Sequence, residues 1–100
     1  MSVTPYSLSL LLVEDEPSIR SLLAEWLRGL DLSVRVAASG EEGIAVCESA
    51  RPGIVLTDIR MPGMGGLAFT KQVRERWPDC PVIVITGQGD EASAIAALKA

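Results

Sequence analysis

The stretch Leu-Thr-Asp-Ile-Arg-Met-Pro-Gly-Met-Gly-Gly, residues 56–66, joins the end of an apolar segment to a loop rich in glycine and proline. The apolar residues 53–57 are typical of a strand that is buried on both faces. Asp58 therefore comes where the strand ends and the loop begins. Ligands of open parallel sheets bind just outside the carboxyl ends of the strands, so we take Asp58 as a candidate site residue.

A second acidic cluster ends another apolar run in the same way. Glu14, Asp15 and Glu16 directly follow a run that we expect to form a strand over 9–13. If the two strands are neighbours, they lie about 4.8 Å apart and the carboxylates of Asp15 and Asp58 nearly touch. Like charges that close repel, and one pKa rises strongly unless a cation lies between them. We therefore expect a site for a divalent cation and a phosphoryl group.

Magnesium is the cation that these residues favour, because it is a hard ion that binds oxygen ligands, including one or two protein carboxylates. The chain has no histidine, and Cys47 and Cys80 form no Cys-x-x-Cys pair. A zinc site and a disulfide are therefore both weak interpretations, and we expect the two cysteines to be small core residues.

Asp58 has a second potential role, because a carboxylate can attack phosphorus and hold an aspartyl phosphate. Thr86 ends the next predicted strand, where its hydroxyl could donate a hydrogen bond to a phosphoryl oxygen, and Gly87 leaves space for a ligand. Each feature has an ordinary structural explanation, since acidic residues often cap the following helix. The joint pattern along one edge of a sheet favours a functional site.

The whole chain alternates between strand and helix patterns, and Ser39 and Glu42 form a capping box. The predicted strands cover residues 9–13, 32–37, 54–57 and 82–86. The predicted helices cover residues 17–30, 40–50 and 67–77, followed by one that Asp90 caps and that runs to the last residue. Such alternation with short loops predicts an α/β fold, a doubly wound parallel sheet with helices on both faces.

The length of 100 residues allows one domain, which we place at 8–100 after an N-terminal extension at 1–7. The net charge of −4 argues against nucleic acid as a direct partner. No run of 18 apolar residues predicts a membrane span, and residues 1–7 lack the features of a signal peptide. We expect a cytoplasmic location as the default.

Three segments together resemble the receiver domain of two-component response regulators. They are Leu-Val-Glu-Asp-Glu at 12–16, Asp-Ile-Arg-Met-Pro-Gly-Met-Gly-Gly at 58–66, and Val-Ile-Val-Ile-Thr-Gly at 82–87. The resemblance implies a flavodoxin-like fold, with strand order 2-1-3-4-5 in complete members. The run at 86–90 is similar to receivers attached to transcription regulators, including the enhancer-binding AAA+ class.

The resemblance also implies roles for particular residues. Asp58 would be the phosphoacceptor for a sensor histidine kinase, and Thr86 would be the switch hydroxyl. Mg²⁺ would be bound by Asp15, by Asp58 and by the main-chain carbonyl of Arg60, with Glu14 helping through water. Phosphorylation would switch a protein-interaction surface and so control an output domain in the parent chain.

The sequence departs from the family pattern in three ways. Glu14 replaces the commoner aspartate, and Gly65 stands where many members have aspartate. The chain also ends before the fifth strand, with its phosphoryl-pairing lysine, and before the fifth helix; Lys99 lies in the last predicted helix and is not that lysine. We therefore expect an incomplete receiver whose exposed fourth strand makes homodimers or exchanges elements between copies. We also expect part of the apolar stripe of the first helix to lose its cover.

The resemblance leaves three functions open. The leading hypothesis is a phosphoacceptor that assists its own phosphorylation and is not a conventional turnover enzyme. A Mg²⁺-dependent phosphatase with an aspartate nucleophile would need a general acid two residues after Asp58, where this chain has Arg60. A pseudo-receiver, or a truncated interaction module that is not phosphorylated, would fit the missing lysine but not the intact acidic trio.

Overall fold

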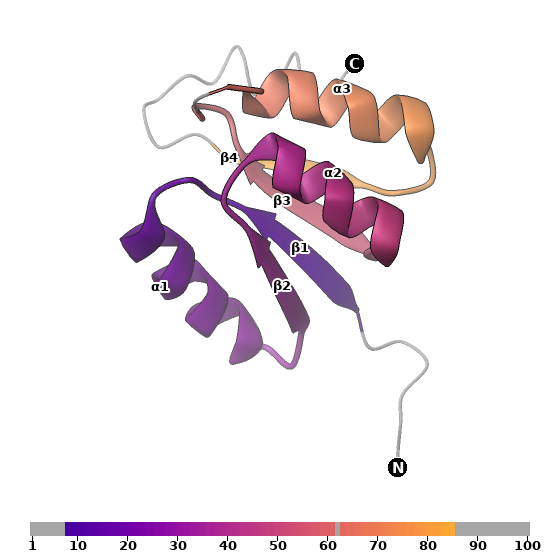
Figure 1. Ribbon diagram of the computed structural model, residues 1–100. Coiled ribbons are helices and arrows are strands. Elements are labelled where there is room, and N and C mark those ends of the chain that lie inside the picture. Colours follow the sequence, from indigo (N-terminus) through magenta and orange to yellow (C-terminus); the bar gives the residue numbers. More distant parts are fainter. Residues whose placement is uncertain (1–7, 62, 86–100) are drawn as a thin grey trace.

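The computed structural model describes residues 8–61 and 63–85. The described elements alternate between strand and helix along the chain (Figure 1). They are β1 (Ser9–Val13), α1 (Pro17–Arg28), β2 (Ser33–Ala37), α2 (Gly40–Ser49), β3 (Ile54–Asp58), α3 (Gly66–Arg76) and β4 (Val82–Ile85). The extension expected at 1–7, Thr86 at the end of the fourth strand, and the helix expected from Asp90 onward lie outside the described residues.

The strands form one sheet in the order β2-β1-β3-β4, and every neighbouring pair is parallel. β1 lies between β2 and β3, so the chain visits an edge strand before it returns to the centre. Helix α1 covers one face of this sheet, and α2 and α3 cover the other (Figure 1). The prediction of a doubly wound parallel sheet is therefore confirmed for the described residues, in which β2 and β4 form the two edges.

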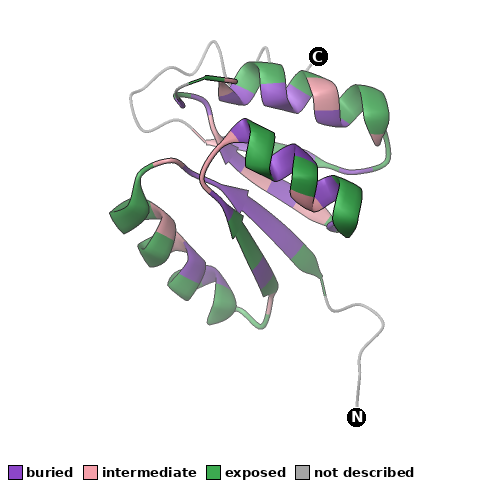
Figure 2. Ribbon diagram, viewed as in Figure 1, coloured by how far each residue is buried: buried purple, intermediate pink, exposed green. Residues whose placement is uncertain are grey.

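Helix α1 begins at Pro17, which suits the first helical position because its missing N–H would have no helical partner. The Glu16 side chain caps this end by accepting a hydrogen bond from the Ser18 backbone N–H at 3.2 Å. Ala24 and Leu27 are the buried residues of the helix. Much of the helix is exposed (Figure 2), and four large apolar side chains are exposed on it or just beyond its end: Ile19, Leu22, Trp26 and Leu30.

Helix α2 confirms the predicted capping box with one adjustment. The Ser39 hydroxyl accepts a hydrogen bond from the Glu42 backbone N–H at 3.1 Å, while the Glu42 carboxylate accepts one from the Ala38 N–H, one residue before the cap. The helix packs very closely, since a Cβ on Gly43 would lie 2.8 Å from the Phe69 ring. A glycine at this position therefore lets α2 approach the sheet and α3.

Two apolar clusters fill the two sides of the sheet. The larger lies under α2 and α3 and includes Phe69, Val73 and both cysteines, which are buried and free as predicted. The smaller lies under α1 and includes Leu10, Leu12 and Leu27. None of the helices in the described ranges has the length and apolarity that a membrane crossing needs.

Candidate functional site

Glu14 directly follows β1 and is almost completely buried, with an exposed fraction of 3%. Its backbone N–H donates to the Ala37 carbonyl at 3.0 Å, which extends the pairing of β1 with β2 by one step. Its carboxylate accepts a hydrogen bond from the Glu16 backbone N–H at 3.1 Å. The sheet therefore holds the main chain of Glu14, and the turn into α1 holds its carboxylate.

Asp58 is the last residue of β3, and its side chain is half-buried. Its carboxylate accepts a long hydrogen bond of 3.5 Å from the Arg60 backbone N–H. The residue before it, Thr57, is fully buried and donates its hydroxyl to the Asp58 carbonyl at 3.0 Å. The strand thus fixes the main chain of Asp58, while the carboxylate itself lies at the open end of the sheet.

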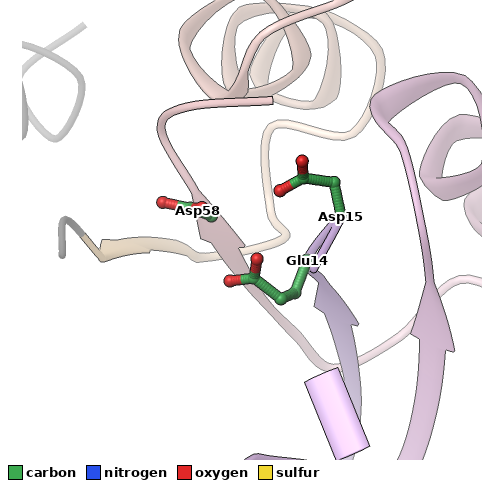
Figure 3. Close-up of side chains that lie close together, drawn as sticks. All are labelled: Glu14, Asp15 and Asp58. Atoms are coloured by element: carbon green, nitrogen blue, oxygen red, sulfur yellow. The ribbon is translucent and has the colours of Figure 1, made fainter. Parts of the chain in front are cut away.

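The three predicted carboxylates converge. Glu14, Asp15 and Asp58 each offer one oxygen, and these oxygens all lie within 4.8 Å of one another. Figure 3 shows the three side chains together at the carboxyl ends of β1 and β3. The adjacency of these two strands in the sheet creates this cluster, because Val13 pairs with Thr57 immediately before it. The convergence predicted from the sequence is confirmed.

The cluster fits Mg²⁺ by the chemistry of its donors. All three side chains offer carboxylate oxygens, which hard divalent cations prefer, and two of them remain half-exposed to the solvent that supplies further ligands. Cys47 and Cys80 belong to the core cluster under α2 and α3, so they add no sulfur ligand that would favour zinc.

The pKa of Glu14 reflects its burial first and the nearby negative charge second. Burial raises the pKa of this carboxyl above its ordinary value, the hydrogen bond from the Glu16 N–H lowers it, and the nearby Asp58 charge raises it further. Bringing a cation to the cluster would relieve this repulsion. The electrostatics and the donor set therefore support the same ligand.

The other predicted site residues are only partly described. Arg60 is exposed and lies in the loop that follows Asp58. Its main-chain carbonyl remains a predicted Mg²⁺ ligand. Thr86, Gly87 and Lys99 lie outside the described residues, so their predicted roles remain predictions.

The loop after β3 is held by contacts that we did not predict from the sequence. The Gly66 N–H donates to the Ile59 carbonyl at 2.8 Å, and a Cβ on Gly66 would collide with the carbonyl oxygen of Asp58. Glu41 of α2 accepts a hydrogen bond of 3.4 Å from the Met64 backbone N–H. The glycine pair at 65–66 was visible in the sequence, but its close approach to Asp58 depends on how the loop folds back.

Comparison with known proteins identifies relatives of this chain. A family model described as response regulator receiver domain matches residues 10–100. The DNA-binding transcriptional regulator NtrC of Salmonella typhimurium is 42% identical over 87 residues, which are 87% of this chain and 19% of that protein. The C4-dicarboxylate transport transcriptional regulatory protein DctD of Rhizobium meliloti is 36% identical over 99 residues, which are 99% of this chain and 21% of that protein. The chain thus spans about a fifth of the length of these relatives.

Solved structures agree with the sequence comparison. The response regulator protein TrrA of Thermotoga maritima, solved in complex with Mg²⁺ and BeF, superposes with a TM-score of 0.84 at 33% identity. The match covers 92% of this chain and 80% of that chain. A response regulator receiver domain protein of Clostridium thermocellum gives a TM-score of 0.86 at 29% identity, over 92% of this chain and 75% of that one.

Proposed function

The chain belongs to the response regulator receiver domain family, and from that membership and the acidic cluster we propose that it accepts a phosphoryl group on Asp58. The observation that carries the proposal is the convergence of Glu14, Asp15 and Asp58 within 4.8 Å at the carboxyl ends of two adjacent strands. A nucleophilic carboxylate and a set of cation ligands occupy the same place, which is the arrangement that phosphoryl transfer to a carboxylate requires.

In the proposed step, a carboxylate oxygen of Asp58 forms a bond to phosphorus while the bond to the leaving group of the donor breaks. The donor is a phosphohistidine of a sensor kinase or a small phosphoramidate, and its nitrogen takes a proton from solvent as it leaves. Glu14, Asp15, Asp58 and the Arg60 carbonyl would hold Mg²⁺, which when bound neutralises charge on the transferring group.

The remaining side chains prepare Asp58 for this step. The pairing of Asp58 with Ile85 of β4 and the hydrogen bond from the Thr57 hydroxyl fix the main chain of Asp58, so that its carboxylate needs little reorganisation. Thr86 is proposed to turn toward the new phosphoryl oxygens, which add about −1.5 to −2 of charge. That movement would shift the population between two states of a protein-binding surface.

The proposal also covers the phosphoryl donor, the output domain and the cellular location of the receiver domain. We propose that a sensor histidine kinase is the donor and that an output domain of a longer regulator responds, as the transcription-regulator relatives suggest. The location proposed for this signalling module is the cytoplasm. Its product is a phosphorylated state of the protein itself, so the domain is a phosphoacceptor and not a conventional turnover enzyme.

Intact-mass spectrometry tests the proposal. We expect the chain to gain the mass of one phosphoryl group when it is incubated with phosphoramidate and Mg²⁺, and we expect no gain with EDTA or in the Asp58→Asn variant. An Asp79→Asn variant, which alters an exposed aspartate outside the cluster, should be phosphorylated like the wild type. Equal labelling of the wild type and Asp58→Asn would refute the proposal, as would no labelling of the wild type.

A further inference from the structure

Arg20 connects helix α1 to the acidic site. It lies in the first turn of the helix, is half-buried, and donates from Nη1 to the main-chain carbonyl of Glu14 at 2.9 Å. The same nitrogen lies 3.4 Å from the carbonyl of Asp15, to which it makes a longer hydrogen bond. One guanidinium therefore holds the main chain of two of the three residues in the carboxylate cluster.

These two carbonyls lie where the sheet no longer fixes the chain. The register of β1 with both neighbouring strands ends at Val13, and among the described residues only the Glu14 N–H continues the pairing. The Glu14 and Asp15 carbonyls come after that point, in the turn toward α1. A guanidinium suits this place, because its planar fork presents several donors in a rigid arrangement.

The helix dipole does not explain a cation at this position. The amino-terminal turn of a helix carries partial positive charge, which disfavours the charge of Arg20, whereas the Glu16 carboxylate at the cap attracts it. Arg28 has the usual arrangement, since it lies in the last turn of the same helix, where a cation is favourable. The contacts of Arg20 with the turn therefore provide a better account of its position.

We propose that Arg20 is a positioning residue that fixes the Glu14–Asp15 main chain so that both carboxylates stay within reach of Asp58. The inference rests on the proposed function for its consequence, which is Mg²⁺ affinity, but its structural part concerns the turn alone. Arg20 touches no reacting group and acts on the site through the main chain of these two acidic residues, while its charge also interacts with the Glu16 carboxylate.

The sign of the effect separates this role from a simple charge effect. A guanidinium beside a cation site repels Mg²⁺ through space, so loss of its charge alone would tighten Mg²⁺ binding. Loss of a positioning contact would weaken binding instead. Contacts around the ligands of a metal site typically change its affinity by roughly 10-fold to 100-fold, so we expect the positioning effect to dominate.

The experiment compares Arg20→Met with Arg28→Met. The control is closely matched, because Arg28 lies in the same helix and donates to a backbone carbonyl, that of Val34, at 3.0 Å. We expect calorimetry to show Mg²⁺ binding weakened roughly 10-fold by Arg20→Met and unchanged by Arg28→Met. Arg20→Lys should recover part of the loss, because an ammonium group can still donate to one carbonyl.

Hydrogen exchange supplies a readout that needs no metal. The Glu16 N–H donates to the Glu14 carboxylate, so its exchange rate reports whether that side chain is in place. We expect Arg20→Met, but not Arg28→Met, to accelerate exchange of Glu16 in the metal-free protein. Equal exchange in the two variants, or Mg²⁺ binding that tightens in Arg20→Met, would overturn the inference. If the wild type binds no Mg²⁺, the proposed function fails, and the exchange comparison alone still decides whether Arg20 positions the turn.

Discussion

Replacing Asp58 with asparagine should make the metal-free protein more stable, although it removes the proposed phosphoacceptor. The carboxylate oxygens of Asp58, Glu14 and Asp15 lie within 4.8 Å of one another. Two unit charges at that distance repel by about 1 kcal/mol in bulk water and by about 3 kcal/mol at the effective dielectric constant typical near protein surfaces. Because Asp58 remains half-exposed, water and salt screen its charge in both pairs, so we take a value near the lower end for each pair.

We therefore expect Asp58→Asn to raise the free energy of unfolding by about 1 to 2 kcal/mol without Mg²⁺. For a domain of this size each kcal/mol corresponds to about 4 to 8 °C in Tm. Urea unfolding measures the difference, with far-UV circular dichroism and fluorescence as two probes. Trp77 packs against the larger core cluster and reports its loss, whereas Trp26 is 64% exposed and changes little.

Magnesium should reverse the order of stability. A ligand that binds only the folded state at 100 times its Kd stabilises that state by about 2.7 kcal/mol. We expect the wild type to gain this stabilisation and Asp58→Asn to lose most of it. The matched control is Asp79→Asn, which removes an exposed aspartate from outside the cluster and should behave like the wild type in both conditions. An Asp58→Asn protein that is no more stable than this control without Mg²⁺ would refute the account of the repulsion.

Three further results are expected. Glu14→Gln should be more stable than the wild type at neutral pH, and the difference should shrink toward low pH. Burial raises the pKa of Glu14, so the folded state holds this proton to higher pH than the unfolded state does. The stability of the wild type therefore falls as the pH rises above the ordinary pKa of 4.5. Urea titrations across pH check this, with the exposed Glu25→Gln as control, and parallel curves for wild type and Glu14→Gln would contradict it. Gly66→Ala should lower the free energy of unfolding by about 3 kcal/mol, because its Cβ would collide with the Asp58 carbonyl and lie 2.7 Å from the Ile59 Cα. The control is Gly65→Ala, whose Cβ would lie 3.6 Å from the Ile59 carbonyl and which should cost about 1 kcal/mol or less. Equal losses of unfolding free energy for the two variants in denaturant melts would show that the close approach of Gly66 to Asp58 is unimportant. Since β4 is an edge of the sheet within the described residues, we expect the 100-residue chain to self-associate at high concentration. Ile83→Lys should reduce this self-association. A compact monomer of the wild type in light scattering would contradict the prediction.

Much of the fold was predictable because its sequence patterns are local. The apolar run at 9–13 became β1, the described part of the β-branched run at 82–86 became β4, and Pro17 marked the start of α1. The parallel arrangement of the strands followed from the alternation of elements, whereas their order followed from the resemblance. The exposure of Leu22 and Trp26 agrees with the expectation that part of the helical stripe lies uncovered, but that expectation came from the resemblance, since a stripe alone shows which residues share a face and not how much of that face is covered.

The site was predictable to the level of its carboxylates. Strand ends place Asp15 and Asp58 at one edge of the sheet, and the pairing of β1 with β3 brings them together. The supporting contacts were not predictable, because they depend on the paths of two turns. The bonds from Arg20 to the Glu14 and Asp15 carbonyls join residues that no spacing rule connects, and the fit of Gly66 over Asp58 appears only once the loop is folded.

The central claim is that the convergent cluster makes Asp58 the phosphoryl acceptor, and locating the acyl phosphate tests this most directly. The chain is incubated with phosphoramidate and Mg²⁺, reduced with borohydride to convert the acyl phosphate to an alcohol, and digested for tandem mass spectrometry. The account predicts reduction at Asp58 alone and only when Mg²⁺ is present. Modification at Glu14 or Asp15 in place of Asp58, or labelling that does not depend on Mg²⁺, would contradict it.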